Sequence, residues 1–516
     1  MLRKIRIVIA TFCFVLITLL FLDFTGTAHA YFGWLAKIQF WPALLALNAG
    51  VVIGLVLLTL VLGRVYCSVI CPLGVMQDVV SWISSRRKRK RFRFSYSPAK
   101  TWLRYGVLAV FIVAFVAGIG SLVALISPYS AYGRIATSLF APVYLEANNL
   151  LATLAERMDS YAFYSVDIWM RGVGTLVVAA VTFVVIAVLA WRNGRTYCNT
   201  ICPVGTVLGL VAQFAWLKPR IDADKCNACG LCSRQCKAAC IDHKNHKIDY
   251  SRCVSCMDCV EACHKGAISY GRPLRVAEAV AEDKPAAQEA RKGMVPVDVS
   301  RRLALSATAL VAVSSVMRAQ QKRKTLEEYV EMKKDGGFAP IVDREGLDRG
   351  GLLTPPGSLS ARNLARHCTA CQLCVSVCEN HVLRPSGNLM TLMQPEMRYE
   401  RGYCRPECTK CSEVCPTGAI KPITVEEKSS IQIGHAVWIK DLCIVNTNNV
   451  SCGNCARHCP TNSIQMVRQD PEKEDSLEIP VVNVETCIGC GACEHLCPAR
   501  PLSAIYVQGH EVHRVI

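Results

Sequence analysis

One phrase decides the fold and occurs twice: residues 63–75 read GRVYCSVICPLGV, and residues 194–206 read GRTYCNTICPVGT. The copies match at Gly, Arg, Tyr, Cys, Ile, Cys, Pro and Gly, so both cysteines of a C-x3-C-P pair are in register. Each copy directly follows a long apolar run. We therefore interpret the phrase as a repeated metal or redox element at a membrane surface.

Four apolar segments are long enough to cross the hydrocarbon core of a bilayer, which is about 30 Å thick. The chain as a whole is 52% hydrophobic with a mean hydropathy of +0.28, which favours a membrane protein with soluble parts. The repeat follows the second and fourth segments, so we expect two parallel helix hairpins related by a pseudo-two-fold axis along the membrane normal. The predicted spans are residues 5–22, 41–63, 105–126 and 174–191.

Basic residues give the predicted orientation. The start MLRKIR and the run RRKRKRFR at residues 86–93 are both placed in the cytoplasm by the positive-inside rule. Much of the net charge of +18 lies in that run, where a topology signal is favoured over nucleic-acid binding. Residues 28–30, Ala-His-Ala, resemble a signal-peptidase site, so cleavage of residues 1–30 stays open. Residues 128–171 are predicted to be a semi-polar external loop.

The first two cysteine runs predict a compact two-cluster ferredoxin at residues 216–271, because C-x2-C-x2-C-x3-C is the ligand spacing of iron–sulfur clusters. The fourth cysteine of each run ligates the other cluster in such proteins, so Cys236 is paired with the second run and Cys263 with the first. Cys240 is surplus and is either a substitute ligand or a free thiol, whereas Cys13 is expected to be ordinary packing. The predicted ligands are Cys226, Cys229, Cys232, Cys236, Cys253, Cys256, Cys259 and Cys263.

Four further runs predict a four-cluster domain at residues 325–516, and the second and third of them have longer first gaps. Residues 272–324 are expected to be a linker. It contains Arg301-Arg302 before a short apolar segment, which is either an export signal for folded proteins, an incidental arginine pair or a fifth span. The predicted ligands are Cys368, Cys371, Cys374, Cys378, Cys404, Cys408, Cys411, Cys415, Cys443, Cys452, Cys455, Cys459, Cys487, Cys490, Cys493 and Cys497.

These spacings predict six [4Fe-4S] clusters and single-electron carriage without giving its direction. The repeat cysteines, Cys67, Cys71, Cys198 and Cys202, could form two disulfides, two buried pairs or one shared seventh cluster; a reducing cytoplasm disfavours disulfides. No C-x2-C-H motif and no dinucleotide fingerprint occur, so haem, flavin and NAD are not predicted. Polar groups beside the spans that could contact a quinol are Lys37, Gln39 and Arg134.

Residues 1–270, with their spans, C-x3-C-P motifs and two-cluster insert, resemble NapH-type membrane ferredoxins of the periplasmic nitrate reductase system. Residues 300–500 resemble NapG-type ferredoxins, including the stretches CRPECTKCSEVCPTGAI and CIVNTNNVSCGNCARHCP. The resemblance implies a quinol dehydrogenase in a bacterial inner membrane that passes electrons from quinol to a periplasmic reductase such as nitrate reductase. It places the first ferredoxin in the cytoplasm and the second in the periplasm. The internal position of the twin arginine departs from the family pattern and puts export by the usual route in doubt.

The resemblance also implies how the last four clusters are shared between runs. Each cluster would take three cysteines from one run and the fourth from a distant run. The implied sets are Cys368, Cys371 and Cys374 with Cys497; Cys487, Cys490 and Cys493 with Cys378; Cys404, Cys408 and Cys411 with Cys459; and Cys443, Cys452 and Cys455 with Cys415.

The sequence thus predicts an α-helical membrane domain at residues 1–215 joined to α+β ferredoxin-like domains. The expected partners are membrane lipid, the quinone pool and a redox partner protein, and the chain is expected to have no terminal substrate site of its own. Two other functions stay open. One is an assembly or maturation reductase for a metalloenzyme, and the other is a ferredoxin-linked electron input to the quinone pool.

Overall fold

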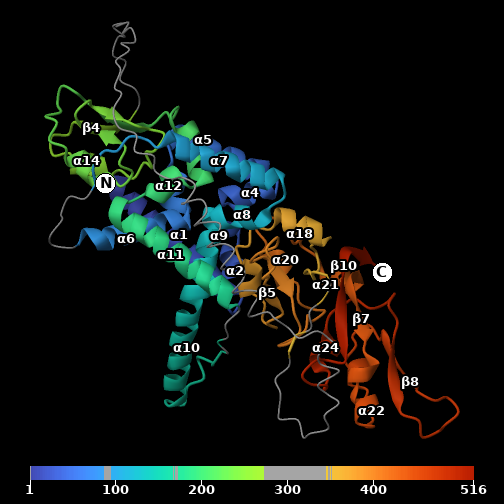
Figure 1. Cartoon of the computed structure of the whole chain (residues 1–516). Coiled ribbons are helices and arrows are strands. Elements are labelled where there is room, and N and C mark those ends of the chain that lie inside the picture. The colour runs from blue at the N-terminus through green and yellow to red at the C-terminus, as the bar shows by residue number, and fades with distance from the viewer. Residues whose placement is uncertain are drawn as a thin grey trace, which may run out of the picture.

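The computed structural model describes residues 2–86, 94–166, 168, 172–271, 345–346, 349 and 351–516. The basic run beyond Arg86 and the twin-arginine segment lie outside these residues. A helical bundle occupies the amino-terminal part, and two bodies built from short helices and strands pack against it (Figure 1). The predicted combination of an α-helical domain with α+β ferredoxin-like parts is therefore visible in the secondary structure.

Two helices in the described part of the chain are long and apolar enough to cross a membrane, α1 (Leu2–Leu22) and α11 (Val173–Asn193). Each has 21 residues, which span about 30 Å at 1.5 Å per residue. Only 28% and 22% of their apolar windows are buried inside the protein. Most of their apolar surface therefore faces outward.

The other two predicted spans are interrupted, so the prediction of four continuous spans is not confirmed. Residues 41–63 form α4 (Phe40–Leu45) and α5 (Ala49–Leu62), separated at Leu47, whose φ is +54°. Residues 105–126 form α7 (Thr101–Val116) and α8 (Gly120–Ile126), separated at Gly118, whose φ is +75°. A left-handed residue ends a helix because it turns the chain away from the helical hydrogen-bond ladder. Because of these interruptions, α5 and α7 are each shorter than the thickness of the hydrocarbon core of a bilayer.

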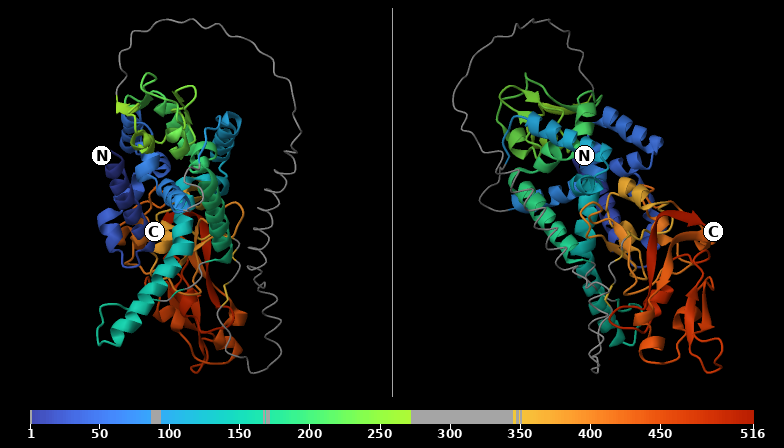
Figure 2. Two further views of the ribbon diagram at one scale, coloured as in Figure 1. Left: turned by 90° about the vertical axis from the view of Figure 1, so that its left-hand side faces the viewer. Right: turned by 45° about the vertical axis from the view of Figure 1, so that its right-hand side comes forward.

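The first part of the stretch predicted as an external loop, residues 128–156, is helical, so the prediction of a loop is wrong there. It forms α9 (Pro128–Ile135), the π-helical turn η2 (Ala136–Phe140) and α10 (Ala141–Glu156). Every residue of α9 is buried, because its tyrosines pack on the end of α1: the ring of Phe21 lies 5.7 Å from Tyr129 and 6.1 Å from Tyr132. Helix α10 projects away from the bundle (Figure 2).

Both copies of the repeat take the same path. In the first, α5 leads into η1 (Tyr66–Ile70) and α6 (Pro72–Ser85); in the second, α11 leads into α12 (Thr196–Thr200) and α13 (Pro203–Ala212). Proline suits the first turn of a helix because its missing N–H would be unpaired there. The copies are also interlocked, since α6 packs on α11 and α13 packs on α5.

The first ferredoxin body covers residues 218–271. Strand β1 (Lys218–Ile221) pairs antiparallel with β4 (Ile268–Gly271), with Ile221 opposite Ile268. Between them lie α14 (Leu231–Gln235), the hairpin of β2 (Ile241–Asp242) and β3 (Lys247–Ile248), and α15 (Asp258–Ala262).

The second ferredoxin body has two halves joined by a long antiparallel ribbon of β7 (Ile431–Trp438) and β10 (Ile505–Val515). Short helices and two-stranded hairpins surround the ribbon on both sides (Figure 1). The first half contains α18 (Ala361–His367), α19 (Leu373–Ser376), β5 (Leu383–Pro385), β6 (Pro395–Met397), α20 (Lys410–Glu413) and α21 (Val425–Ser430). The second contains η4 (Lys440–Leu442), α22 (Ile444–Thr447), α23 (Asn454–Arg457), β8 (Ile464–Arg468), β9 (Glu478–Val482) and α24 (Ala492–Leu496).

Helix α1 separates the two ferredoxin bodies. At its start, Arg3 forms ion pairs with Asp258 at 2.8 Å and Glu261 at 2.7 Å in the first body. Its other end contacts α19 of the second body. The two bodies therefore lie at opposite ends of a helix about 30 Å long (Figures 1 and 2).

Candidate metal centre

The structure brings the four repeat cysteines into one buried core. Cys67, Cys71, Cys198 and Cys202 are each no more than 5% exposed, and all four belong to the same cluster of packed residues. Nothing pairs them as disulfides, since all four are free thiols. The predicted convergence of the two C-x3-C-P motifs is therefore visible in the packing.

The arginines of the repeat cross from one copy to the other. Arg64 Nη2 donates to the carbonyl oxygen of Cys198 at 3.4 Å. Arg195 Nη1 donates to the carbonyl oxygen of Cys67 at 2.6 Å. Each arginine thus fixes the first cysteine of the other copy. This reciprocal contact explains why both copies contain Arg at the same position.

The repeated glycines of C-P-x-G make room for this crossing. A Cβ atom on Gly74 would lie 2.3 Å from the carbonyl oxygen of Cys67 and 2.5 Å from Arg195 Nη1. A Cβ on Gly205 would lie 2.2 Å from the carbonyl oxygen of Cys198 and 2.9 Å from Arg64 Nη2. Only glycine allows the backbone and the guanidinium to approach this closely.

The repeated tyrosines tie the site to the interrupted helices. Tyr66 Oη donates to Gln39 Oε1 at 3.0 Å, and Tyr197 Oη donates to the carbonyl oxygen of Ile126 at 2.9 Å. Gln39 is therefore fully buried beside the repeat, whereas Lys37 is exposed. Arg134 is also fully buried, and its Nη1 donates to the carbonyl oxygen of Ala124 at 2.8 Å. Of the three candidate quinol contacts, Gln39 is the one hydrogen-bonded to the repeat in the described part of the chain.

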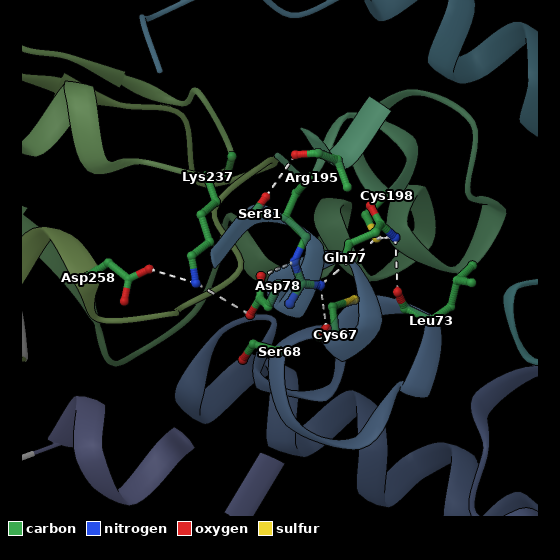
Figure 3. A network of polar contacts seen from close by, with 12 residues as sticks. Cys67, Ser68, Leu73, Gln77, Asp78, Ser81, Arg195, Cys198, Lys237 and Asp258 are labelled. Atoms are coloured by element: carbon green, nitrogen blue, oxygen red, sulfur yellow. Dashed lines mark hydrogen bonds and ion pairs between the residues drawn. The ribbon is translucent and has the colours of Figure 1, made fainter. Parts of the chain in front are cut away.

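A chain of charges connects the repeat to the first ferredoxin body (Figure 3). Asp78 binds Arg195 at 2.8 Å and lies 3.6 Å from Lys237, which in turn binds Asp258 at 3.0 Å. Burial raises the pKa of the Asp78 carboxyl, but Arg195, Lys237 and Arg6 outweigh burial and hold that pKa well below its usual value. The repeat does not reveal this network, because only one of its copies has an aspartate seven residues after the second cysteine.

Several N–H groups point at the sulfur atoms. Gln77 Nε2 lies 3.3 Å from Cys198 Sγ, Arg64 Nη2 lies 3.7 Å from Cys67 Sγ, and the backbone N–H of Gly205 lies 3.3 Å from Cys202 Sγ. Hydrogen bonds to sulfur stabilise thiolate ligands and tune a cluster's potential. The donors favour negatively charged sulfur at this site.

Burial alone would keep these thiols protonated. Burial, followed by repulsion from neighbouring cysteines, raises the pKa of Cys71 to about 12. Arg195 Nη2 and Arg64 Nε are buried with no hydrogen-bond partner in the described part of the chain. The iron of a polynuclear cluster would offset the charge of four thiolates, and the two guanidinium groups would offset part of what remains. The donor set thus fits an iron–sulfur cluster.

A single metal ion fits less well. Among the described residues, no group of three or more Cys, His, Asp or Glu side chains is placed to hold one ion. A four-iron cluster makes a different demand, because each cysteine binds a different iron at a separate corner. The sets of cysteines therefore have to surround a cavity rather than converge on a point.

In the first ferredoxin body such a cavity is lined by Cys253, Cys256 and Cys259 together with Cys236. This is the pairing predicted for the second run. Cys240 lines the same cavity, with its sulfur 3.5 Å from that of Cys236. The predicted pairing of Cys263 with the first run stays a prediction.

The second ferredoxin body contains three further cavities of the same kind. In each, the fourth cysteine comes from the neighbouring run. The sets are Cys404, Cys408 and Cys411 with Cys378; Cys443, Cys452 and Cys455 with Cys497; and Cys487, Cys490 and Cys493 with Cys459.

The cluster pairing implied by the family resemblance is therefore wrong for this structure. Burial raises the pKa of Cys374, and the neighbours that add to this include Cys368, Cys371 and Cys415. Since Cys378, Cys459 and Cys497 line the other three cavities, Cys415 is left as the fourth cysteine for the remaining run. The reason is the β7–β10 ribbon, which leaves runs one and two in one half of the body and runs three and four in the other.

Left-handed residues shape the backbone around the second cysteine of the regular runs. Ala370 and Gln372 flank Cys371 with φ of +52° and +65°. The residues around the second cysteine of the other three regular runs do the same, at Ala228 and Gly230, Ser255 and Met257, and Gly489 and Gly491. Such alternation turns successive N–H groups into a concave anion-binding surface, which is a known setting for iron–sulfur groups.

Comparisons with known families agree with this geometry. A 4Fe-4S binding domain model matches residues 44–91 and again 175–223, which are the two copies of the repeat with their preceding helices. A second 4Fe-4S binding domain model matches residues 246–269, and a 4Fe-4S dicluster domain model matches residues 450–500. No solved structure matches the chain.

Named relatives are ferredoxin-type proteins. The methylamine utilization ferredoxin-type protein MauM of Methylophilus methylotrophus is 29% identical over 30% of this chain and 71% of its own length. In Escherichia coli (strain K12), NapG is 26% identical over 34% of this chain and 80% of its own length, and NapF is 26% identical over 35% of this chain and its whole length. The chain is therefore a ferredoxin-type 4Fe-4S electron-transfer protein related to Nap components.

Proposed function

We propose that the chain is a membrane-bound quinol-oxidising subunit that passes single electrons through its clusters to a redox partner. The observation that carries the proposal is one continuous buried core. It contains the four repeat cysteines, Cys256 of the first ferredoxin body and Cys371 of the second. The repeat site thus connects both sets of clusters.

The repeat would hold a seventh cluster, which supplies a one-electron acceptor between the two bodies when bound. The chain's own residues do the rest. Cys67, Cys71, Cys198 and Cys202 bind it, Arg64 and Arg195 fix the cysteine backbones, and burial keeps water from the sulfur atoms. The match of a 4Fe-4S model to each copy supports this assignment.

The junction with the second body is tight. A Cβ on Gly133 of α9 would lie 2.3 Å from the carbonyl oxygen of Cys371. Thr137 Oγ1 donates to Gln372 Oε1 at 3.2 Å across the same contact. The cluster held by Cys371 and its set is therefore the one that faces the helical bundle, and we take it as the first acceptor in the second body.

Two observations support a membrane location with the ferredoxin bodies on opposite sides. Helices α1 and α11 expose most of their apolar surface, and exposed apolar area of this extent is typical of a lipid or protein contact. The bodies bind opposite ends of α1, so a spanning α1 would put the first body in the cytoplasm and the second in the periplasm. Reporter fusions after residues 271 and 516 test this placement directly.

The direct test uses the purified full-length protein in lipid vesicles with a short-chain quinol. We expect the visible absorption of the oxidised clusters to bleach on adding quinol and to return on adding quinone. Protein that carries its full iron content yet shows neither change would overturn the proposal. Loss of metal loading in a partner enzyme, with electron flow intact in a deletion strain, would instead favour the maturation function.

The seventh cluster has its own test in the iron content of variants. Replacing Cys71 or Cys202 by Ser is expected to remove about four iron atoms per chain, because thiolate ligation is lost. The matched control is Cys13→Ser, which removes a thiol of α1 that belongs to no cysteine run. Unchanged iron in the repeat variants would leave only two buried structural pairs.

A nitrate reductase as final acceptor rests on the relation to NapG and NapF, and a pull-down with the periplasmic fraction tests it.

A further inference from the structure

Five thiols share the cavity of the second cluster in the first ferredoxin body, although a cluster of this kind takes four. Cys253, Cys256 and Cys259 come from one run. The other two are Cys236 and Cys240, whose sulfur atoms lie 3.5 Å apart. Cys240 is 1% exposed, so it is neither a surface thiol nor available to solvent. The surroundings of the two sulfurs decide which of them binds iron.

Cys236 has the surroundings of a ligand thiolate. The side chain of Cys240, followed by the backbone N–H groups of Cys240, Ala238 and Ala239, lowers the pKa of the Cys236 thiol. Ala239 has a φ of +51°, and its N–H donates to the carbonyl oxygen of Cys236 at 3.0 Å, so the chain turns tightly around this cysteine. Backbone donors converging on one sulfur favour its thiolate form, because thiolate only accepts hydrogen bonds.

Cys240 has the surroundings of a donor. Its sulfur lies 3.5 Å from that of Cys236, and Cys253 lines the same cavity. Apolar side chains of Ile241 and Ile248 cover the cavity beside it. When both neighbours are thiolate ligands, neither can donate, so the proton between them has to come from the Cys240 S–H.

We propose that Cys240 is a positioning residue for the second cluster: its S–H donates to the ligand sulfur of Cys236 and raises the reduction potential of that cluster. The inference rests on the proposed electron-carrying function of this body. A reduced cluster carries one more negative charge on its sulfurs than an oxidised one, so a donor stabilises the reduced form more. Taking a hydrogen bond to a charged group at about 1.5 kcal/mol, its loss changes the reduction equilibrium about tenfold.

The experiment is an EPR-monitored redox titration of the full-length protein, with iron and sulfide counted on the same samples. In Cys240→Ala we expect full iron content and one cluster signal shifted about tenfold in its reduction equilibrium, or about 59 mV to more negative potential. In Cys240→Ser the hydroxyl keeps a donor, and we expect the potential to return toward the wild-type value. Cys13→Ala is the matched control and should leave every signal unchanged.

Cys236→Ala completes the test, because it is expected to lose about four iron atoms. The proposal is overturned if Cys236→Ala keeps its iron while both Cys240 variants lose it, since Cys240 would then be the ligand. It is also overturned if Cys240→Ala shifts no signal. The iron content and the reduction potential of the cluster are measured with a chemical reductant. The result therefore does not depend on whether the protein oxidises quinol.

Discussion

The two copies of the repeat are alike where they build the site and different where they attach it. Arginine, tyrosine, cysteine and glycine occupy matching places in both copies, and the arginines and glycines make matching contacts with the cysteine backbones. Beyond the motif, however, Asp78 and Gln77 of the first copy stand where the second has Gly209 and Leu208. The shared residues therefore hold the cysteines in place, and the unmatched residues determine which neighbouring groups each copy contacts.

The unmatched positions serve different neighbours. Asp78 binds Arg195 and faces Lys237 of the first ferredoxin body. At the equivalent place, Gly209 leaves room for Arg104, whose Nη2 would lie 2.0 Å from a Cβ there. Arg104 in turn binds Ser251 Oγ at 3.0 Å. Both copies therefore hold the same body, one through an acidic side chain and the other through a guanidinium admitted by glycine.

A large effect, equal in the two copies, is expected at the glycines that they share. Gly74→Ala and Gly205→Ala should each destabilise the protein by about 3 kcal/mol and reduce its iron content, because the new Cβ overlaps a cysteine carbonyl. Gly54→Ala is the control on α5, where nothing lies within 4 Å of the new Cβ. There Ala should be neutral or stabilising. Thermal unfolding and iron counts measure both; a strong response in only one copy would contradict the symmetry.

The arginines should separate the copies. Arg195→Leu leaves Asp78 buried without its closest cation, which costs about 3–5 kcal/mol. Arg64 binds carbonyl, amide and sulfur acceptors, and Arg64→Leu should cost about 1–3 kcal/mol. The free energy of unfolding in denaturant measures the difference. Equal losses would show that Asp78 adds nothing to the contact.

A smaller effect is expected at Asp78 itself, and it depends on pH. Its pKa is lowered in the folded protein, so its stabilising contribution is complete above the unfolded value of about 3.9 and is lost as pH falls below it. Asp78→Asn should cost about 2 kcal/mol near pH 7 and remove that part of the acid sensitivity. Thermal midpoints of both proteins between pH 3 and pH 7 test this. Parallel curves would contradict the assigned role.

The smallest effect should come from making the copies more alike. Gln77→Leu gives the first copy the residue of the second and removes the N–H that points at Cys198 Sγ. Iron content and stability should change little, because Leu fills a similar volume. The potential of the repeat cluster should become more negative, as seen in an EPR-monitored titration. Leu208→Gln is the reciprocal variant, and an unchanged potential in Gln77→Leu would remove Gln77 from the tuning of the site.

Spacing predicted the cysteine runs, the repeat and the place of Cys236, because ligand spacing is local and is carried by residue type. It did not predict the breaks at Leu47 and Gly118, where uninterrupted apolar sequence hides a change of backbone dihedral. Nor did it predict that α9 is buried, since its tyrosines and arginine look polar until they meet α1. The pairing of the last four clusters failed because it depends on the β7–β10 ribbon, a contact between residues far apart in sequence.

The crossed arginines have a consequence for how such a site can arise. Neither copy can complete its own cysteine pair, since each lacks the guanidinium that the other provides. A chain with one copy could form the site only by pairing with a second chain about the same axis. The two copies in this chain thus stand to each other as two subunits of such a dimer would, and the residues outside the motif differ between them in the attachments that they make.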